Sequence, residues 1–248
     1  MRFLFLVILS GLVAGSPADF KSSQMNYPRV RAAFRDKEAM VNGMLSDRKI
    51  DPARMQIFIR VFKQEKLLQV WAGNRGEKLV HLINYDICAS SGTLGPKRKV
   101  GDYQVPEGFY EINRFNPSSN FHLSLGINYP NRSDRILSPY GNPGGDIFIH
   151  GNCVTIGCIP ITDDKIKELY VLAVMAKNNG QDHIPVHLFP TALSDDHFNA
   201  LSKQYSADPS MVSFWENLKE GYDLFEKERI VPEVKVNDEG KYIYPLQP

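Results

Sequence analysis

Short apolar and alternating runs fill the chain between residues 55 and 127 and predict β-strands. Alternation of apolar and polar residues is typical of strands that bury one face. Polar turn sequences such as Gly73-Asn74-Arg75-Gly76 separate the early runs and predict hairpin connections. The predicted strands cover residues 56–62, 67–71, 78–87, 108–113, 121–127, 146–150 and 184–189.

A helical spacing of apolar residues replaces this alternation after residue 161. Between residues 162 and 177 the apolar positions follow a helical period, beginning at Ile166 and Leu169. Thr162-Asp163-Asp164 has the form of an N-cap followed by an acidic first turn. Further helices are expected at residues 28–45, 194–202 and 209–227, with a closing hairpin at 231–245. Segment 128–145 is rich in Pro, Asn, Ser and Gly, so it is expected to be a loop bordering a cleft.

The N-terminal segment has the features of a secretory signal peptide. Arg2 precedes an apolar stretch from residue 3 to residue 13, and the small residues Ala14, Gly15 and Ser16 follow. The stretch is too short to span a bilayer, although an apolar first helix of the domain is an alternative. We therefore expect an exported protein of the periplasm or cell envelope whose mature chain does not span the membrane.

Composition excludes several classes of protein. The 248 residues include 43% hydrophobic ones, enough for a sizeable core, so disorder is not indicated. Lys plus Arg is 29 and Asp plus Glu is 28, giving a net charge of +1. This balance, without a basic run, gives no support for a nucleic-acid partner.

The three cysteines are too few for a disulfide scaffold in so long a chain. Because the number is odd, at least one thiol is free or pairs outside the chain. Cys88 lies in an apolar strand and is expected to be an inert packing residue. Cys153 is expected either to pack or to line the loop that precedes Cys158.

A histidine and a cysteine come together in the segment Asp146-Ile-Phe-Ile-His150-Gly-Asn-Cys153-Val-Thr155-Ile-Gly157-Cys158. A strand delivers His150 at its end, and a short loop returns the chain to Cys158. A thiol needs a neighbouring base or cation to become a thiolate near neutral pH, and histidine is the usual partner. Gly157 permits a tight turn, whose backbone N–H groups are candidates for an oxyanion hole.

This motif resembles that of the L,D-transpeptidase family (YkuD-type domain), in which a strand-borne His-Gly or His-Ser precedes Ser/Thr-X-Gly-Cys. Here those elements are His150-Gly151 and Thr155-Ile156-Gly157-Cys158. The closest resemblance is to a murein endopeptidase-like branch that includes lipoprotein-releasing amidases. Other segments that share it are Gly95-Pro96-Lys97, Gly101-Asp102, Pro106-Glu107-Gly108-Phe109-Tyr110, Asn116-Pro117-Ser118, Phe121-His122-Leu123-Ser124-Leu125, Tyr129-Pro130-Asn131 and the segment from Phe214 to Tyr222.

The resemblance implies an α+β fold with a β-rich catalytic domain and C-terminal helices. On this basis residues 1–16 are expected to be the signal peptide and 17–54 an N-terminal leader with a helix. Residues 55–190 are expected to form the L,D-transpeptidase-like catalytic domain. Residues 191–248 are expected to be a helical extension packed on that domain.

The resemblance also implies a mechanism. Cys158 attacks the carbonyl of the diaminopimelate residue in a peptidoglycan stem peptide, and His150 accepts the thiol proton. The Gly151 carbonyl orients the imidazole, and the amides of Gly157 and Cys158 hold the oxyanion. No cofactor or metal is expected, and the partners are stem peptides and a wall-linked lipoprotein.

Five further residues are candidates for substrate binding. His122 alternates with Ser124 on one predicted strand face and is placed to reach the cleft. The others are Tyr129 and Asn131 on the following loop, Thr155 in the motif, and Arg114.

Two departures from the family pattern bear on the reaction. Most members carry histidine where this chain has Ile156, and many carry arginine or asparagine where it has Pro160. An arginine there would bind a substrate carboxylate, whereas proline has no donor. We therefore expect water to be the preferred acceptor, so that the protein is mainly a hydrolase (amidase). The alternative is transpeptidation, with Arg114 binding the carboxylate.

Non-enzymatic alternatives are also open. His150, Cys153 and Cys158 are three potential zinc ligands, although their spacing matches no common zinc finger and a fourth ligand is not evident. A non-catalytic wall-binding module is the other alternative. A papain-like protease is disfavoured because its cysteine precedes its histidine in the sequence.

Overall fold

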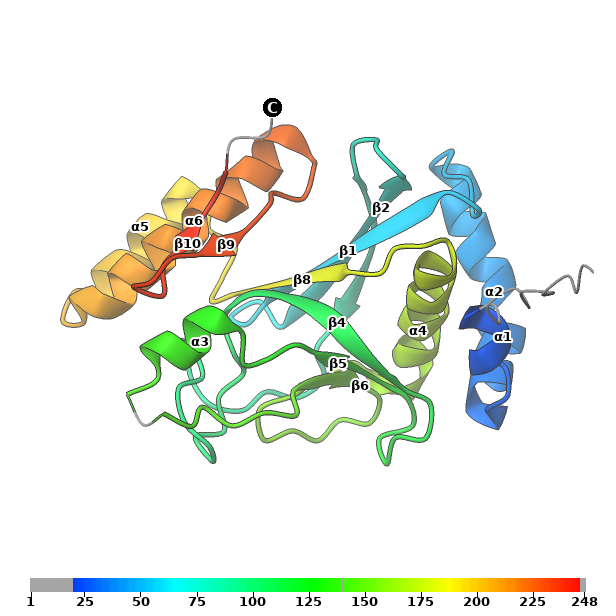
Figure 1. Ribbon diagram of the computed structural model, residues 1–248, viewed down its shortest axis with the longest axis horizontal. Coiled ribbons are helices and arrows are strands. Elements are labelled where there is room, and N and C mark those ends of the chain that lie inside the picture. The colour runs from blue at the N-terminus through cyan, green and yellow to red at the C-terminus, as the bar shows by residue number, and fades with distance from the viewer. Residues whose placement is uncertain (1–19, 140, 246–248) are drawn as a thin grey trace, which may run out of the picture.

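The computed structural model describes residues 20–139 and 141–245, so the predicted signal peptide lies outside the described residues. Eight strands form one mixed sheet in the order β3-β2-β1-β8-β4-β5-β6-β7 (Figure 1). The strands are β1 (Met55–Phe62), β2 (Leu67–Asn74), β3 (Val80–Asp86), β4 (Gly108–Asn116), β5 (Ser124–Ile127), β6 (Phe148–His150), β7 (Ile159–Pro160) and β8 (Ile184–Phe189), with a separate hairpin of β9 (Lys235–Val236) and β10 (Tyr242–Ile243). The helices are α1 (Phe20–Gln24), α2 (Pro28–Asp47), α3 (Arg132–Leu137), α4 (Thr162–Asn178), α5 (Asp195–Gln204) and α6 (Pro209–Glu228).

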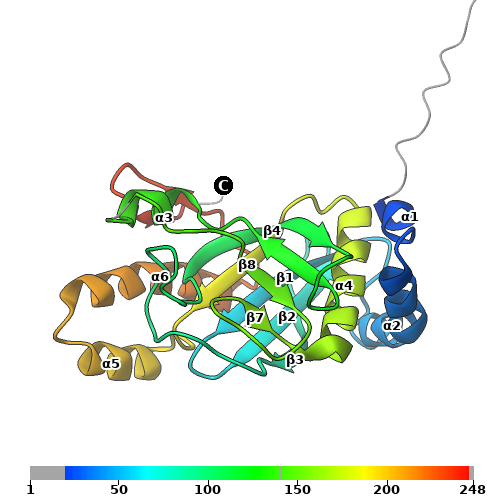
Figure 2. The ribbon, with the colours of Figure 1, turned by 90° about the horizontal axis from the view of Figure 1, so that it is seen from below.

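Helix α4 covers one face of the sheet. Its apolar positions include Ile166, Leu169 and Tyr170, all fully buried. Figure 2 shows α4 between the sheet and α2, so α4 is enclosed on both sides. The ion pair between Lys37 and Asp164 joins α2 to α4 at 2.7 Å.

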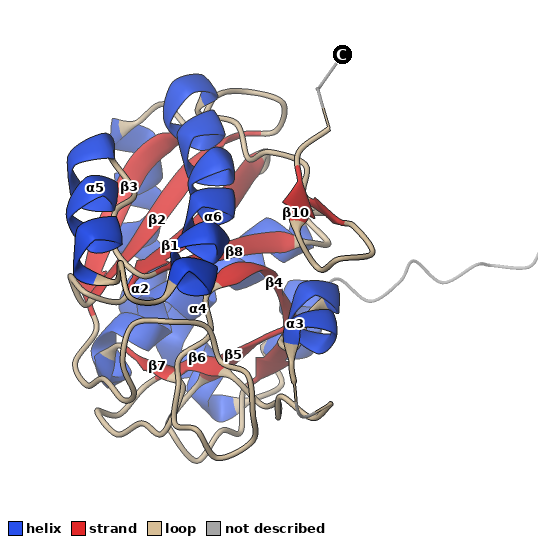
Figure 3. Ribbon diagram, turned by 90° about the vertical axis from the view of Figure 1, so that its left-hand side faces the viewer, coloured by secondary structure: helices blue, strands red, loops and turns tan. Residues whose placement is uncertain are grey.

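Helix α6 covers the opposite face, and Figure 3 shows it in front of the strands together with α5. The sheet has a hydrophobic core on each face, and alternate residues of β8 point into one core or the other. Val186 and Leu188 belong to the core that contains α4, while Phe189 packs with Trp215 and Tyr222 of α6. Central strands buried on both faces explain why their sequences are apolar rather than cleanly alternating.

The predicted strands and long helices are confirmed within a few residues, but two predictions were wrong. The expected loop 128–145 contains α3, because Asn131 and Asp134 form a capping box at its start. The N-cap of α4 is Ile161, not Thr162, and it makes no side-chain capping bond. Strand β7 and helix α1 were not predicted, since two and five residues are too short for a periodic signal. Among the described residues, no helix is both long and apolar enough to cross a bilayer.

A histidine is buried between the sheet and α6. His187 lies in β8 with 3% of its surface exposed, and its ring contacts Phe58 and Phe109. Burial lowers the pKa of His187 well below its usual value, and the nearby Arg60 cation lowers it further. The folded protein therefore holds this imidazole in its neutral form.

We predict that the protein loses stability on mild acidification. A histidine whose pKa is depressed in the folded state stabilises above its unfolded pKa, and this stability is lost as pH falls below about 6.5. For His187 the slope approaches about 1.4 kcal/mol per pH unit. The free energy of unfolding in urea, measured between pH 7.5 and 5, should show a smaller slope in His187→Leu. Equal slopes in both proteins would contradict the prediction.

Candidate active site

The pairing of two very short parallel strands brings Cys158 close to His150. In β6 and β7, Ile149 is opposite Ile159 and His150 is opposite Pro160. Cys158, one residue before Ile159, therefore comes level with Phe148. Because alternate residues share a face, Phe148 and His150 lie on the same side of β6, while Ile149 is fully buried in the core.

The imidazole of His150 is held in one orientation. Its Nδ1 lies 2.5 Å from the carbonyl oxygen of Gly151, so Nδ1–H donates and Nε2 keeps a lone pair. The ring of Phe121 covers it, with ring centroids 4.7 Å apart. Burial lowers the pKa of His150, and the bond to Gly151 partly offsets this lowering.

The thiol of Cys158 is half-buried and lies 3.7 Å from the carbonyl oxygen of Asp146. Burial raises the pKa of the thiol, and the Asp146 carboxylate raises it further. A hydrogen bond from the Phe148 backbone N–H and the charge of Lys97 lower it. The raised pKa of Cys158 and the lowered pKa of His150 both favour neutral side chains in the resting protein. A proton must therefore pass from the thiol to the imidazole before the sulfur becomes a thiolate.

Cys158 and His150 open onto one cavity of about 550 Å³. Apolar side chains form much of its wall, and three of them are well exposed, at 40% for Phe121, 51% for Val154 and 75% for Ile156. The polar lining includes Asn116, Ser119, Asn120, Ser124, Asp146 and Thr155. On another side, Cys158 borders a second cavity of about 220 Å³ next to residues 89–94.

Thr155 organises the turn before the nucleophile. Its hydroxyl donates to the Cys158 carbonyl at 2.8 Å and accepts from the Gly157 N–H at 3.1 Å. Gly157 has φ +135°, a conformation that favours glycine, and an added Cβ would lie 3.0 Å from the Gln104 carbonyl oxygen. The turn therefore needs glycine for both its conformation and its close contact with the neighbouring loop.

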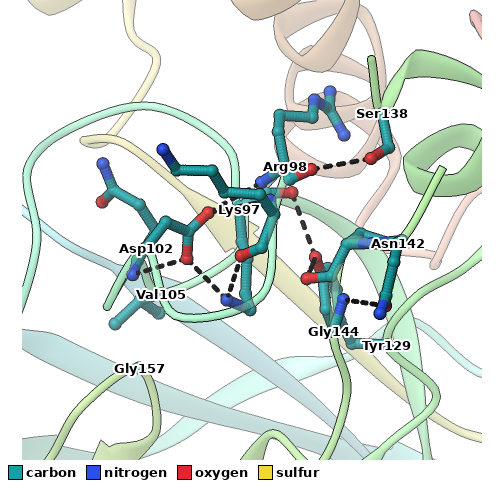
Figure 4. Close-up of polar contacts among 12 residues, drawn as sticks. Lys97, Arg98, Asp102, Val105, Tyr129, Ser138, Asn142, Gly144 and Gly157 are labelled. Atoms are coloured by element: carbon teal, nitrogen blue, oxygen red, sulfur yellow. Dashed lines mark hydrogen bonds and ion pairs between the residues drawn. The ribbon is translucent and has the colours of Figure 1, made fainter. Parts of the chain in front are cut away.

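That neighbouring loop, residues 97–105, is held together by Asp102 (Figure 4). The Asp102 carboxylate accepts from the backbone N–H groups of Arg98 and Lys99 and pairs with the Lys97 ammonium at 2.5 Å. The Tyr129 hydroxyl lies 3.1 Å from the Lys97 carbonyl oxygen, so it also supports the loop. The loop is thus a preformed wall beside Gly157.

A buried ion pair anchors the same loop to α6. The Lys63 ammonium donates to the carbonyls of Gly95 and Val105 and pairs with Glu107 at 2.9 Å. Glu107 is fully buried and also accepts from the Trp215 indole N–H at 2.7 Å. These bonds leave the buried charges fully partnered, as burial requires.

The structure gives the five expected substrate-binding residues different positions. Thr155 lines the cavity, and Arg114 lies at its rim, bonded to Asp146 at 3.0 Å. Tyr129 is only 6% exposed beneath loop 97–105, and Asn131 caps α3 and donates to Tyr242. His122 has a buried Nε2 without a partner among the described residues. Burial lowers the pKa of His122, and the charge of Arg29 lowers it further. The positions of Tyr129, Asn131 and His122 therefore give no support to substrate contact.

A disulfide joins Cys88 to Cys153, with Cα atoms 5.4 Å apart, and Cys158 keeps a free thiol. The interpretation of Cys88 as an inert packing residue was wrong, and so was packing as the role of Cys153. The disulfide also removes Cys153 from the zinc hypothesis, because a disulfide sulfur is not a thiolate ligand. It ties the loop between His150 and Cys158 to the segment after β3.

A family model described as the L,D-transpeptidase catalytic domain matches residues 56–186, which is just over half of the chain. The chain belongs to the L,D-transpeptidase family. The family resemblance of the motif and the α+β fold are thereby confirmed. Members of this family are cysteine-dependent enzymes whose substrate is peptidoglycan, which places this L,D-transpeptidase-family protein at the cell envelope.

The chain is similar to one curated relative and, more remotely, to solved structures. YafK of Escherichia coli (strain K12), which carries the name of an L,D-transpeptidase, is 37% identical over 189 residues, or 75% of this chain and 73% of YafK. The helical cell shape determining protein Pgp2 of Campylobacter jejuni matches with a TM-score of 0.44 and 20% identity, over 74% of this chain and 73% of Pgp2. Bd1075 of Bdellovibrio bacteriovorus gives a TM-score of 0.39 and 24% identity, over 70% and 62% of the two chains. Structural likenesses of this size say nothing about function.

Sequence reasoning missed several parts of this L,D-transpeptidase-family site. Phe121 was assigned to a strand, but it lies before β5 and covers His150. Asp146 was given no role, yet its carbonyl oxygen faces the thiol. Neither contact leaves a local sequence signal, because each depends on residues more than ten positions apart.

We predict that the disulfide contributes strongly to stability. It closes a sequence separation of 65 residues, for which the loss is about 2–4 kcal/mol when such a bond is removed. Urea unfolding of a Cys88→Ser/Cys153→Ser double variant should show that loss, with Cys158→Ser as the matched control. Thiol titration of the denatured wild type should give one thiol before reduction and three after it. Three thiols before reduction would contradict the disulfide.

Proposed function

We propose that this protein is mainly a hydrolase of peptidoglycan stem peptides that attacks the diaminopimelate carbonyl through a Cys158 acyl-enzyme. The observation that carries the proposal is that the free thiol of Cys158 and the oriented imidazole of His150 open onto the same cavity. A cavity of about 550 Å³ is of the size that binds small ligands or parts of a peptide. The oriented base matters because an undirected imidazole would be a poor proton acceptor.

The chemical steps follow from the tautomer of His150. Because Nδ1–H donates to Gly151, Nε2 accepts the proton of Cys158 as the sulfur attacks the carbonyl carbon. The C–N bond then breaks, and the imidazolium returns its proton to the departing amine. Water attacks the thioester carbon and gives a proton to His150. The C–S bond then breaks, the imidazolium returns its proton to the sulfur, and the carboxylic acid that leaves loses its proton to the solvent.

The oxyanion is assigned to the amides of Gly157 and Cys158. The Gly157 N–H donates to the Thr155 hydroxyl at 3.1 Å, so this donor becomes available when a substrate oxygen replaces that hydroxyl. Thr155 keeps its bond to the Cys158 carbonyl during the exchange. Thr155 therefore supports the turn in the resting protein and yields one donor to the transition state.

Arg114 is our candidate for the substrate carboxylate. Its guanidinium lies over the Phe148 ring at 4.6 Å and pairs with the exposed Asp146 carboxylate, both at the cavity. Exposed ion pairs are weak, so an incoming carboxylate can replace Asp146. Pro160 is buried in β7 and offers no side-chain donor.

Hydrolysis is preferred over transfer because of the residues around the thiol. Ile156, which replaces the histidine of most members, is 75% exposed at the cavity and has no polar group to bind a second stem. The branch that shares the Ile-Gly-Cys form releases wall-linked lipoproteins, and a lipoprotein amine is a suitable leaving group. Transpeptidation, with a second stem or a D-amino acid as acceptor, is the other candidate.

We predict that Cys158→Ala abolishes activity on purified peptidoglycan while the thermal midpoint stays within a few degrees, because only the nucleophile is removed. His150→Ala should lower turnover by about 10²–10⁴-fold, as is typical for a general base. Liquid chromatography of the released products measures both. Turnover by Cys158→Ala within a few-fold of the wild type would exclude the mechanism.

The acceptor is tested by supplying a diaminopimelate-linked peptide together with excess D-amino acid. We predict that mass spectrometry shows mainly the free tripeptide carboxylate, because water attacks the thioester faster. Arg114→Ala should raise KM more than it lowers kcat if Arg114 binds the carboxylate, with Arg135→Ala as an exposed control. Predominance of exchanged or crosslinked product would make the protein a transpeptidase and leave the roles of Cys158 and His150 intact.

A further inference from the structure

The N-terminal helix α2 reaches the active site through one arginine. Arg29, in the first turn of α2, donates from Nη1 to the carbonyl oxygen of Ser119 at 2.5 Å and to that of His122 at 2.8 Å. The two contacts join residues at least 90 positions apart in the sequence. Helix α2 lies outside the residues matched by the family model, so the family motif gives no reason for this contact.

The two carbonyls flank Phe121, the residue that covers the base. The Ser119 hydroxyl also accepts the Phe121 N–H at 3.1 Å, and Ser119 is only 4% exposed. The Phe121 ring itself is 40% exposed, while the His150 beneath it is 1% exposed. Because the Phe121 side chain is not packed within the hydrophobic core, the position of its ring depends on the conformation of the backbone at residues 119–122.

We propose that Arg29 is a positioning residue that holds the backbone on both sides of Phe121 and so keeps the Phe121 ring over the His150 imidazole. This inference rests on the proposed function of His150 as the base. Hydrogen bonds from a charged donor are stronger than neutral ones, so two of them to neighbouring carbonyls can select one conformation of a short segment.

The position of the Phe121 ring affects the hydration of the His150 imidazole. With Phe121 in place, water is excluded from one face of the imidazole, which favours its neutral form. The titratable groups around His150 are Cys158 before β7, Asp146 before β6 and Asp163 at the start of α4, whose carboxylate accepts the Asn152 N–H at 2.8 Å. Arg29 bonds to none of these three groups in the described part of the chain, so release of Phe121 changes the hydration of His150 and leaves their own contacts in place. The Arg29 charge also lowers the pKa of the neighbouring His122, and this effect would persist without the Phe121 ring, so a double-variant cycle separates the two routes.

The sign of the effect follows from burial. Burial lowers the pKa of His150, so hydration after release of Phe121 raises it toward its usual value. The acid limb of Cys158 reactivity then moves to higher pH. A shift of about half a pH unit lowers reactivity about threefold below both midpoints and leaves it nearly unchanged above them.

The test is the rate of Cys158 alkylation by iodoacetamide from pH 4.5 to 8.5, which needs no cell-wall substrate and uses the single free thiol of the native protein. We expect Arg29→Ala to raise the acid midpoint by about half a unit and to lower the rate about threefold at the acid end. Arg31→Ala is the matched control, because Arg31 lies on the same helix and, within the described part of the chain, donates only to the local carbonyls of Met25 and Asn26. It should follow the wild-type profile.

A double-variant cycle tests the route through Phe121. Phe121→Ala should raise the midpoint in the same direction, and adding Arg29→Ala to it should cause no further shift. The proposal is overturned if Arg29→Ala coincides with Arg31→Ala, or if Arg29→Ala has the same effect in both backgrounds. Absence of peptidoglycan cleavage together with the alkylation shift would refute the proposed function and leave this inference standing.

Discussion

The active site depends on a parallel pairing between strands of three and two residues. Parallel strands normally need a crossover of a dozen or more residues, usually through a helix. Here eight residues suffice, because β6 and β7 are so short that the chain only has to turn back by a few ångströms. The register of Ile149 with Ile159 then determines that Cys158 lies beside Phe148 and near His150. A slip of one residue would turn the nucleophile into the core.

Everything around this pairing limits how far the connecting loop can move. The disulfide ties its middle at Cys153 to the segment after β3, and the first turn of α4 holds Asn152 through Asp163. On the other side, the loop containing Gln104 contacts Gly157 and is itself fixed by the buried Lys63–Glu107 pair. The Trp215 bond extends this support to α6. Two helices that follow the site in the sequence, α4 and α6, therefore help to hold its loops in place.

The sequence was sufficient to predict the features that depend on local, periodic patterns. Strand alternation, the helical repeat of α4 and the eight-residue spacing of His150 and Cys158 are short-range patterns, and each was recognised. The helix α3 was recognisable in principle, since Asn131 and Asp134 have capping-box spacing, but its six residues were hidden in a Pro- and Gly-rich segment. The Cys88–Cys153 pair, the cover of His150 by Phe121 and the burial of Tyr129 depend on tertiary packing. Cysteine counting showed only that one thiol had to be left over.

The environment of the thiol bears on the fate of the acyl-enzyme. Burial lowers the pKa of His150 and raises the pKa of Cys158, so both side chains are favoured in their neutral forms. If the resting pair were a thiolate and an imidazolium, each substrate would have to displace the water around both charges. A neutral thiol and imidazole do not carry this desolvation cost. In the proposed reaction the thioester would face a cavity in which Phe121, Val154 and Ile156 are the well-exposed apolar side chains. These three side chains give a polar stem no hydrogen bond, whereas the proposed activation of water needs only the Nε2 lone pair of His150. Phe121, whose ring covers His150, thus also belongs to the apolar part of the cavity on which our proposal of water as the acceptor rests.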